Sequence, residues 1–153
     1  SLMGSAIVDT LLYFIVGQFI LWAGSKFYKW ICEVDVHHVI EKDDNMAMGM
    51  SYGGFLIAVG ILVHHGLRIA SLTRWTADGA VVRDLLIEIP TCVAVVLFGM
   101  LLLWAARLFA DKVLLSKSPL TKEIVIDKNP AAGGVEAACY ICAALAFGFS
   151  TVG

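Results

Sequence analysis

Four apolar runs, each long enough to cross a lipid bilayer, dominate this sequence and limit what it can fold into. A membrane-spanning helix needs about 20 mostly apolar residues. With 59% hydrophobic and 16% charged residues, the composition is also that of a membrane protein. We therefore predict an all-α integral membrane protein, one domain over residues 1–153, with four transmembrane helices. The runs cover residues 6–27, 46–67, 85–110 and 130–152.

Lysine and arginine are unevenly placed around the ends of these runs, and this predicts an orientation. Four spans bring both termini to one side of the membrane, with the first and third connections on the other. Positively charged residues favour the cytoplasmic side. Eight lie near the first and third connections (residues 26, 29, 42, 107, 112, 117, 122 and 128), against three, Arg68, Arg74 and Arg83, on the other side. We therefore predict cytoplasmic first and third connections and termini outside.

A short motif occurs twice, each time at the start of an apolar run. The copies are "DDNMAMGM", beginning at Asp43, and "DKNPAAGG", beginning at Asp127. A shift of 84 residues superimposes them and pairs Asn45 with Asn129. Because two spans separate the copies, both halves have the same orientation, which is typical of a parallel repeat about an axis along the membrane normal. The predicted two-helix repeats cover about residues 6–69 and 85–153.

The chemistry of the motif indicates the start of a helix. Asn is a strong N-cap, so Asn45 and Asn129 are expected to cap the second helix of each half. Pro130 then occupies the first helical position, which Pro favours. Asp43 and Asp127 place negative charge near the positive end of the helix dipole. We predict that the motif is a pair of helix caps at the membrane surface.

Small residues follow each cap at a spacing that lets membrane helices approach closely. Gly49 and Gly53 form one such pair, and Gly133 and Ala137 form the other. We predict that these faces pack inside the bundle. The same faces would equally suit contacts between subunits, so a homo-oligomer is also expected.

These residues resemble a bacterial inner-membrane family catalogued as domain of unknown function 350. Its members are similar in having four spans and two acidic-x-Asn-x-Ala signatures that open the second and fourth helices. The matching stretches are "DDNMAMGMSYGGFLIAVG" and "KEIVIDKNPAAGG". One departure is Val39-Ile40, where the family pattern favours Glu-Ile. The resemblance implies a multi-pass protein of the bacterial inner membrane with an envelope-stress role, and it assigns no activity.

Glu136 is an ionisable residue about 10 Å inside the fourth run, seven residues past Asn129. Charged groups at such depth are expensive and face protein or water. Two interpretations remain open: an ion or proton pathway, and a hydrogen-bonded contact between helices. The 84-residue shift pairs Glu136 with Tyr52, so we expect these two side chains to share a hydrogen bond.

Glu88 lies two residues before Pro90 in the third run. A proline in a membrane helix frees a backbone carbonyl and can open a kink for a polar pathway. The alternative is an interfacial acid at a helix start.

No metal or cofactor is expected. An Asp-x-Asn calcium loop needs Glu at its twelfth position, where the two motif copies have Gly54 and Ala138.

Two functional hypotheses follow from these residues. A net charge of −2 provides no basic field, so nucleic acid is excluded as a partner. The sequence has no phosphate loop, nucleophile elbow or zinc-protease motif, so an enzyme is not expected. The first hypothesis is a membrane scaffold or envelope-stress component, held in the lipid bilayer, whose connections dock a cytoplasmic protein. The alternative is a small oligomeric ion or proton channel or carrier that uses Glu136, with Glu88 as a second pathway residue.

Overall fold

Helices form nearly all of the computed structural model, which describes residues 2–72, 81–115 and 117–150. No strand occurs among these residues, so the predicted all-α class is confirmed. Four helices are long and apolar enough to cross a membrane, as predicted. The elements are α1 (Leu2–Cys32), α2 (Val36–Glu41), α3 (Met46–Leu72), α4 (Val81–Phe109), the π-helical segments η1 (Ala110–Leu114) and η2 (Lys122–Ile126), and α5 (Pro130–Ser150).

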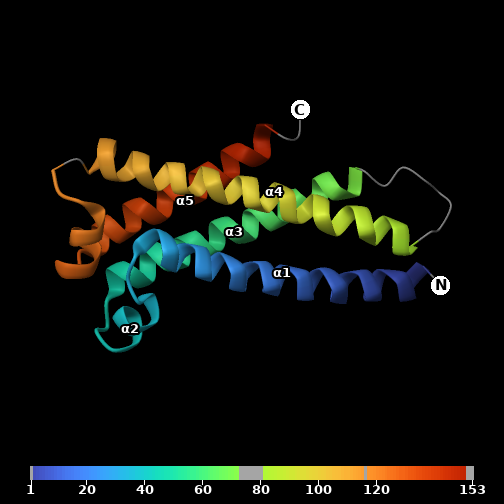
Figure 1. The fold of residues 1–153 in the computed structure, drawn as a ribbon, viewed down its shortest axis with the longest axis horizontal. Coiled ribbons are helices and arrows are strands. Elements are labelled where there is room, and N and C mark those ends of the chain that lie inside the picture. The colour runs from blue at the N-terminus through green and yellow to red at the C-terminus, as the bar shows by residue number, and fades with distance from the viewer. Residues whose placement is uncertain (1, 73–80, 116, 151–153) are drawn as a thin grey trace.

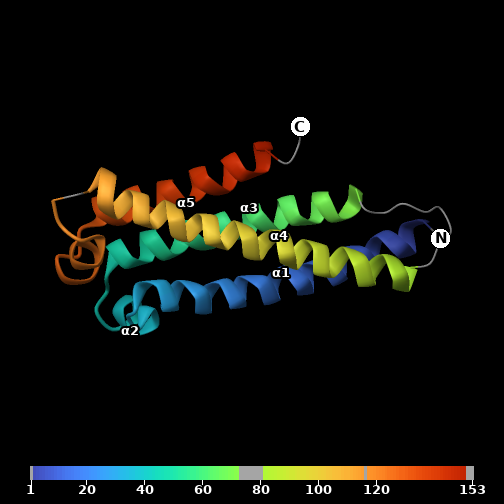
Figure 2. The same cartoon turned by 45° about the horizontal axis from the view of Figure 1, so that its top comes forward.

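The four long helices run side by side along the longest axis of the molecule (Figure 1). α3 packs against α1, α4 and α5, and its interface with α5 is the most extensive in the bundle. The connection that carries α2 and the one that carries η1 and η2 gather at the same end, opposite the N-terminus (Figures 1 and 2). We call this the motif end. The described polar connections therefore form one surface at one end of the bundle.

α1, α3 and α4 extend beyond the apolar runs that predicted them. α1 covers Leu2–Cys32, α3 ends at Leu72 and α4 already begins at Val81. Pro90 therefore lies well inside α4. Arg74, which was counted in the predicted orientation, and residues 151–153 of the predicted second repeat lie outside the described residues.

The closest helix contact joins α3 to α5 through small residues. A Cβ added to Gly54 would meet the Cβ of Ala137 and lie 2.6 Å from its Cα. A Cβ added to Gly133 would meet the carbonyl oxygen of Ala47 and lie 2.9 Å from its carbonyl carbon. Gly133 and Ala137, two of the predicted packing residues, thus lie in this contact. At Gly54 and Gly133 only glycine lets the backbones approach so closely.

Gly49 and Gly53 were also predicted to pack inside the bundle, and for these two the prediction is wrong. A Cβ added to either glycine would have no atom within 4 Å among the described residues. The buried face of α3 is a different one from the face of Gly49 and Gly53. Its small residues are Ala47, Ser51, Gly54 and Ala58. The face of Gly49 and Gly53 is left open.

The outer surface of the spans is apolar, as contact with a lipid bilayer requires. α1 is the most exposed of the four and packs mainly on α3. Large apolar side chains point outward along it, among them Phe14, Phe19 and Trp22. The protein is therefore a multi-pass membrane protein whose spans contact lipid.

Candidate functional site

Asn45 connects the two halves of the chain at the motif end. Its Oδ1 accepts a hydrogen bond of 3.1 Å from the backbone N–H of Met48, which is the geometry of an N-cap on α3. Its Nδ2 donates to the carbonyl oxygen of Ile124, in η2, at 2.8 Å. The side chain is 2% exposed, so both bonds are shielded from water. Asn45 thus starts α3 and fixes η2 against it.

Asn129 begins α5 with a related geometry. Its Oδ1 accepts from the backbone N–H of Ala131 at 3.1 Å, and its Nδ2 donates to Glu123 Oε2 at 3.2 Å. Its amide therefore stays within its own connection, whereas that of Asn45 reaches the other one.

The backbones of the two motif copies also correspond. Asp44 and Lys128, which the 84-residue shift pairs, have φ values of 48° and 49°. This left-handed conformation is uncommon for residues other than glycine. The backbone N–H of Asn45 donates to Val39, and that of Asn129 donates to Glu123, which the same shift also pairs. The two connections therefore turn into their helices in the same way.

Asp43 and Asp127 lie on the exposed surface of this end. Asp43 Oδ2 is 4.0 Å from His38 Nδ1, and Asp127 Oδ2 is 4.0 Å from Lys122 Nζ. Such exposed pairs contribute little to stability. A firmer contact joins the copies, because Lys128 Nζ donates to the carbonyl oxygen of Asp43 at 2.7 Å.

A buried charged cluster lies behind the motif end, between α1, α4 and α5. Arg107 Nη1 is 2.5 Å from Glu136 Oε1. The Glu136 side chain is fully enclosed and that of Arg107 is 10% exposed. An ion pair inside a membrane bundle avoids the cost of two separate buried charges. We define the charged cluster as Arg107, Glu136 and the three residues that bond to them, Tyr140, Cys32 and Thr121.

The other three members of the charged cluster form hydrogen bonds with Arg107 and Glu136. The Tyr140 hydroxyl donates to Glu136 Oε1, one helical turn away on α5. Arg107 Nη1 also donates to Cys32 Sγ at 3.1 Å, and Nη2 donates to Thr121 Oγ1 at 3.1 Å. Glu136 Oε2 is buried without a hydrogen-bond partner among the described residues. One carboxylate oxygen therefore has unused capacity to accept a hydrogen bond.

An aromatic layer separates the charged cluster from the rest of the α3 interface. The Tyr28 ring lies 6.3 Å from that of Tyr140 and 5.1 Å from that of Phe55. The Tyr28 hydroxyl bonds to Ser51 Oγ at 2.7 Å, so it has its own partner on α3. The charged cluster is therefore closed on this side by packed rings.

The charged cluster also borders a cavity of about 390 Å³ at the motif end. Its lining includes Arg107, Cys32 and Thr121, together with Glu33 and Asp111. Glu136 does not line it. The cavity can therefore bring water to the guanidinium and leaves the carboxylate enclosed.

The predicted hydrogen bond between Tyr52 and Glu136 is wrong. The Tyr52 hydroxyl donates to Ser25 Oγ, on α1, at 2.8 Å. Glu136 pairs instead with Arg107, because a buried carboxylate gains more from a cation than from a hydroxyl.

Glu88 has a separate position in the bundle. It is 2% exposed and accepts a hydrogen bond from the Tyr13 hydroxyl of α1. It does not lie in the charged cluster described above.

Sequence reasoning missed Arg107, Tyr140, Cys32 and Thr121 as neighbours of Glu136. Arg107 was counted among the positively charged residues near the third connection, where lysine and arginine are common. One signal was available, since Tyr140 follows Glu136 by four residues and therefore lies on the same helix face. The other three come from different segments, and nothing in their local sequence points to Glu136.

Among the described residues, no group of three or more His, Cys, Asp or Glu side chains could hold a metal ion.

The comparisons with known proteins agree with this architecture. The pattern of a family described as Domain of Unknown Function (DUF350) matches residues 1–150, which is nearly the whole chain. No curated protein and no solved structure gave a significant match. The four apolar helices fit the four spans expected of this family. The chain therefore belongs to the DUF350 family of membrane proteins.

Proposed function

We propose that this protein is a non-enzymatic membrane scaffold that presents the motif end to a cytoplasmic protein partner. One observation carries the proposal: the two connections are bound to each other by Asn45 and Lys128 and form a single, defined polar surface. A preformed surface binds a partner at a lower entropic cost than two mobile loops. The motif end carries acidic and basic side chains in close alternation, among them Asp43, Lys122 and Asp127.

The proposal includes a location and an arrangement. The excess of positive charges near the motif end supports a cytoplasmic motif end with the termini outside. The bacterial inner membrane is the location that the family resemblance implies. The shared backbone geometry of the two motif copies supports two parallel repeats. The open face of Gly49 and Gly53 supports a homo-oligomer, because small residues without a partner in the chain allow a second helix to approach.

The test is site-specific photo-crosslinking in living cells. A crosslinker at Lys122 or at His37, both exposed at the motif end, is expected to capture one discrete protein. A crosslinker at exposed Phe14, which points outward from α1 within the apolar span and away from the motif end, is the matched control and is expected to capture none. Charge reversal of Lys122 and Lys128 is expected to abolish capture at His37. Equal capture at all three positions, or none at the motif end, would contradict the scaffold proposal.

A second candidate is an ion or proton carrier that uses Glu136. Two observations favour it: the unpartnered Glu136 Oε2 and the cavity that reaches Arg107. Against it, the α3–α5 contact is too close to leave a path between these helices. In liposomes containing the purified protein, this candidate requires a proton or ion flux that Glu136→Gln reduces at least tenfold. Equal flux in both proteins, or in protein-free liposomes, would eliminate it.

A further inference from the structure

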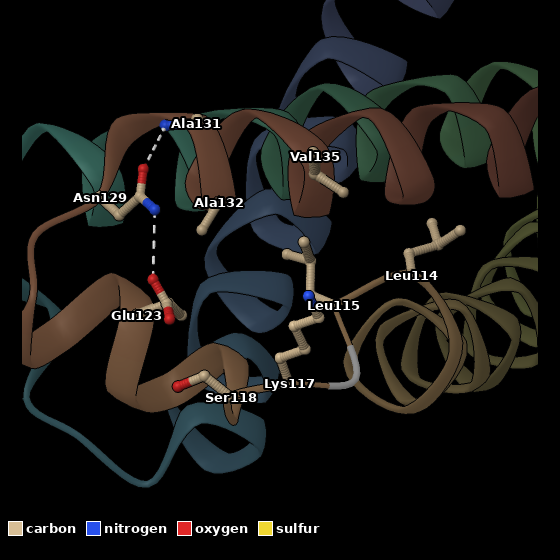
Figure 3. Close-up of a pocket in the computed structure, with 9 residues that line it drawn as sticks. All are labelled: Leu114, Leu115, Lys117, Ser118, Glu123, Asn129, Ala131, Ala132 and Val135. Carbon is tan, nitrogen blue, oxygen red and sulfur yellow. Dashed lines mark hydrogen bonds between the residues drawn. The ribbon is translucent and has the colours of Figure 1, made fainter.

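A second cavity lies at the motif end, between the third connection, which carries η1 and η2, and the start of α5 (Figure 3). Its volume is about 380 Å³. Three segments enclose it: the end of η1 with the residue that follows it, the stretch that leads into η2 together with the start of η2, and the N-cap and first turns of α5. The lining residues are Leu114, Leu115, Lys117, Ser118, Glu123, Asn129, Ala131, Ala132 and Val135.

The depth of this cavity corresponds to the membrane surface. The apolar span that contains α4 ends at Leu114, and the span of α5 begins at Pro130. Leu114, Leu115 and Val135 therefore lie at the level where lipid chains begin. Lys117, Ser118 and Glu123 belong to the polar connection beyond it. One end of the cavity suits hydrocarbon and the other suits a headgroup.

The polar end contains one cation and one anion. In Figure 3 the Lys117 side chain extends from the connection toward α5, beside Leu115. No ion pair or hydrogen bond of its ammonium group is found among the described residues. The Ser118 hydroxyl oxygen is buried and likewise has no hydrogen-bond partner in the described part of the chain. Glu123 is held in place by Asn129 Nδ2 at 3.2 Å.

We propose that this cavity binds a phospholipid whose headgroup carries both a phosphate and a primary amine, as phosphatidylethanolamine does. The phosphate accepts hydrogen bonds from the Lys117 ammonium group and the Ser118 hydroxyl. The primary ammonium group donates to the Glu123 carboxylate. An acyl chain passes Leu114, Leu115 and Val135 into the bilayer. Each charged group of the lining then has a partner of opposite charge.

The same lining discriminates against the other common headgroups. An anionic glycerol headgroup brings no cation to Glu123 and leaves that carboxylate unpaired. Choline carries a quaternary ammonium that has no N–H to donate, and proteins recognise it through aromatic rings. No aromatic residue lines this cavity. Selectivity for a primary amine is therefore the distinguishing expectation.

The experiment measures lipid binding to the intact protein, delipidated in a mild neutral detergent. Phosphatidylethanolamine, phosphatidylcholine and phosphatidylglycerol with identical acyl chains are titrated separately, with bound lipid counted by native mass spectrometry. Phosphatidylethanolamine is expected to bind at least about tenfold more tightly than either of the others, as expected for one charge-assisted hydrogen bond. Equal affinity for the three lipids would overturn the proposal.

Two variants locate the binding to this cavity. Glu123→Gln keeps an acceptor for Asn129 and removes the charge, so it is expected to abolish the preference for the amine headgroup. Lys117→Gln is expected to weaken all three lipids about tenfold by removing the phosphate contact. Lys112→Gln, an exposed lysine outside the lining, is the matched control and is expected to bind like the wild type. Wild-type binding in both lining variants would also overturn the proposal.

Discussion

Replacement of Arg107 by methionine is expected to lower the free energy of unfolding by about 3–5 kcal/mol, as found when one partner of a buried ion pair is removed. Glu136 is fully enclosed and would keep only the Tyr140 hydroxyl as a partner. Methionine retains much of the volume of arginine, so the loss reports on the charge rather than on a cavity. The measurement is unfolding of the purified protein by a denaturing detergent, followed by tryptophan fluorescence.

Two further variants show whether the stranded charge is the cause. Lys29→Met removes an exposed pair with Asp35, separated by 3.4 Å, and is expected to change stability by less than about 1 kcal/mol. The double variant Arg107→Met/Glu136→Leu is expected to recover most of the loss, because an apolar pair has no charge to desolvate. If the double variant were as unstable as Arg107→Met alone, the charge would not be the origin of the loss.

Gly54→Ala is expected to destabilise the protein by about 1–3 kcal/mol, the usual cost of overfilling a packed interface. The new methyl group would collide with Ala137, whose Cα lies 2.6 Å from the Cβ position. Because the collision involves the α5 backbone, no side-chain rotation can relieve it. The thermal midpoint of the purified protein in detergent measures the effect.

The neighbouring glycine provides the control for this substitution. Gly53→Ala adds the same methyl group on the same helix, where no atom lies within 4 Å among the described residues. Alanine also favours helix over glycine by up to about 1 kcal/mol. An unchanged or slightly raised midpoint is therefore expected for the protein held as a monomer in detergent. Equal losses in the two variants would mean that the α3–α5 contact is not the cause.

The spans and the caps could be predicted because their signals are local. An apolar run of about 20 residues is itself the physical requirement for crossing a bilayer. The side chains of Asn45 and Asn129 accept hydrogen bonds from backbone groups only two or three residues ahead, so the motif letters contain the information.

The packing face of α3 shows where a local pattern is insufficient. Gly49 and Gly53 have the familiar four-residue spacing, yet the buried small residues Ala47, Ser51, Gly54 and Ala58 follow steps of four, three and four. Both sets are compatible with a helix face. Adjacent residues point about 100° apart, so only the partner helix decides which set is buried.

The charged cluster shows a different limit. Arg107 and Glu136 are 29 residues apart and on different helices, so no periodicity connects them. The 84-residue shift suggested Tyr52 for Glu136 because a repeat predicts equivalent positions. Equivalence does not extend to the charged cluster: Ala23, which the shift pairs with Arg107, carries no charge.

The bond from Asn45 to Ile124 has a consequence for how the protein is made. The acceptor is 79 residues further along the chain, beyond two more spans, so it does not yet exist when α3 enters the membrane. Until then the Asn45 side-chain N–H can donate only to water or to lipid headgroups. The first two spans therefore enter the membrane without this hydrogen bond, which forms only after η2 has been synthesised. Folding of the first half is therefore tied to the completed synthesis of the third connection.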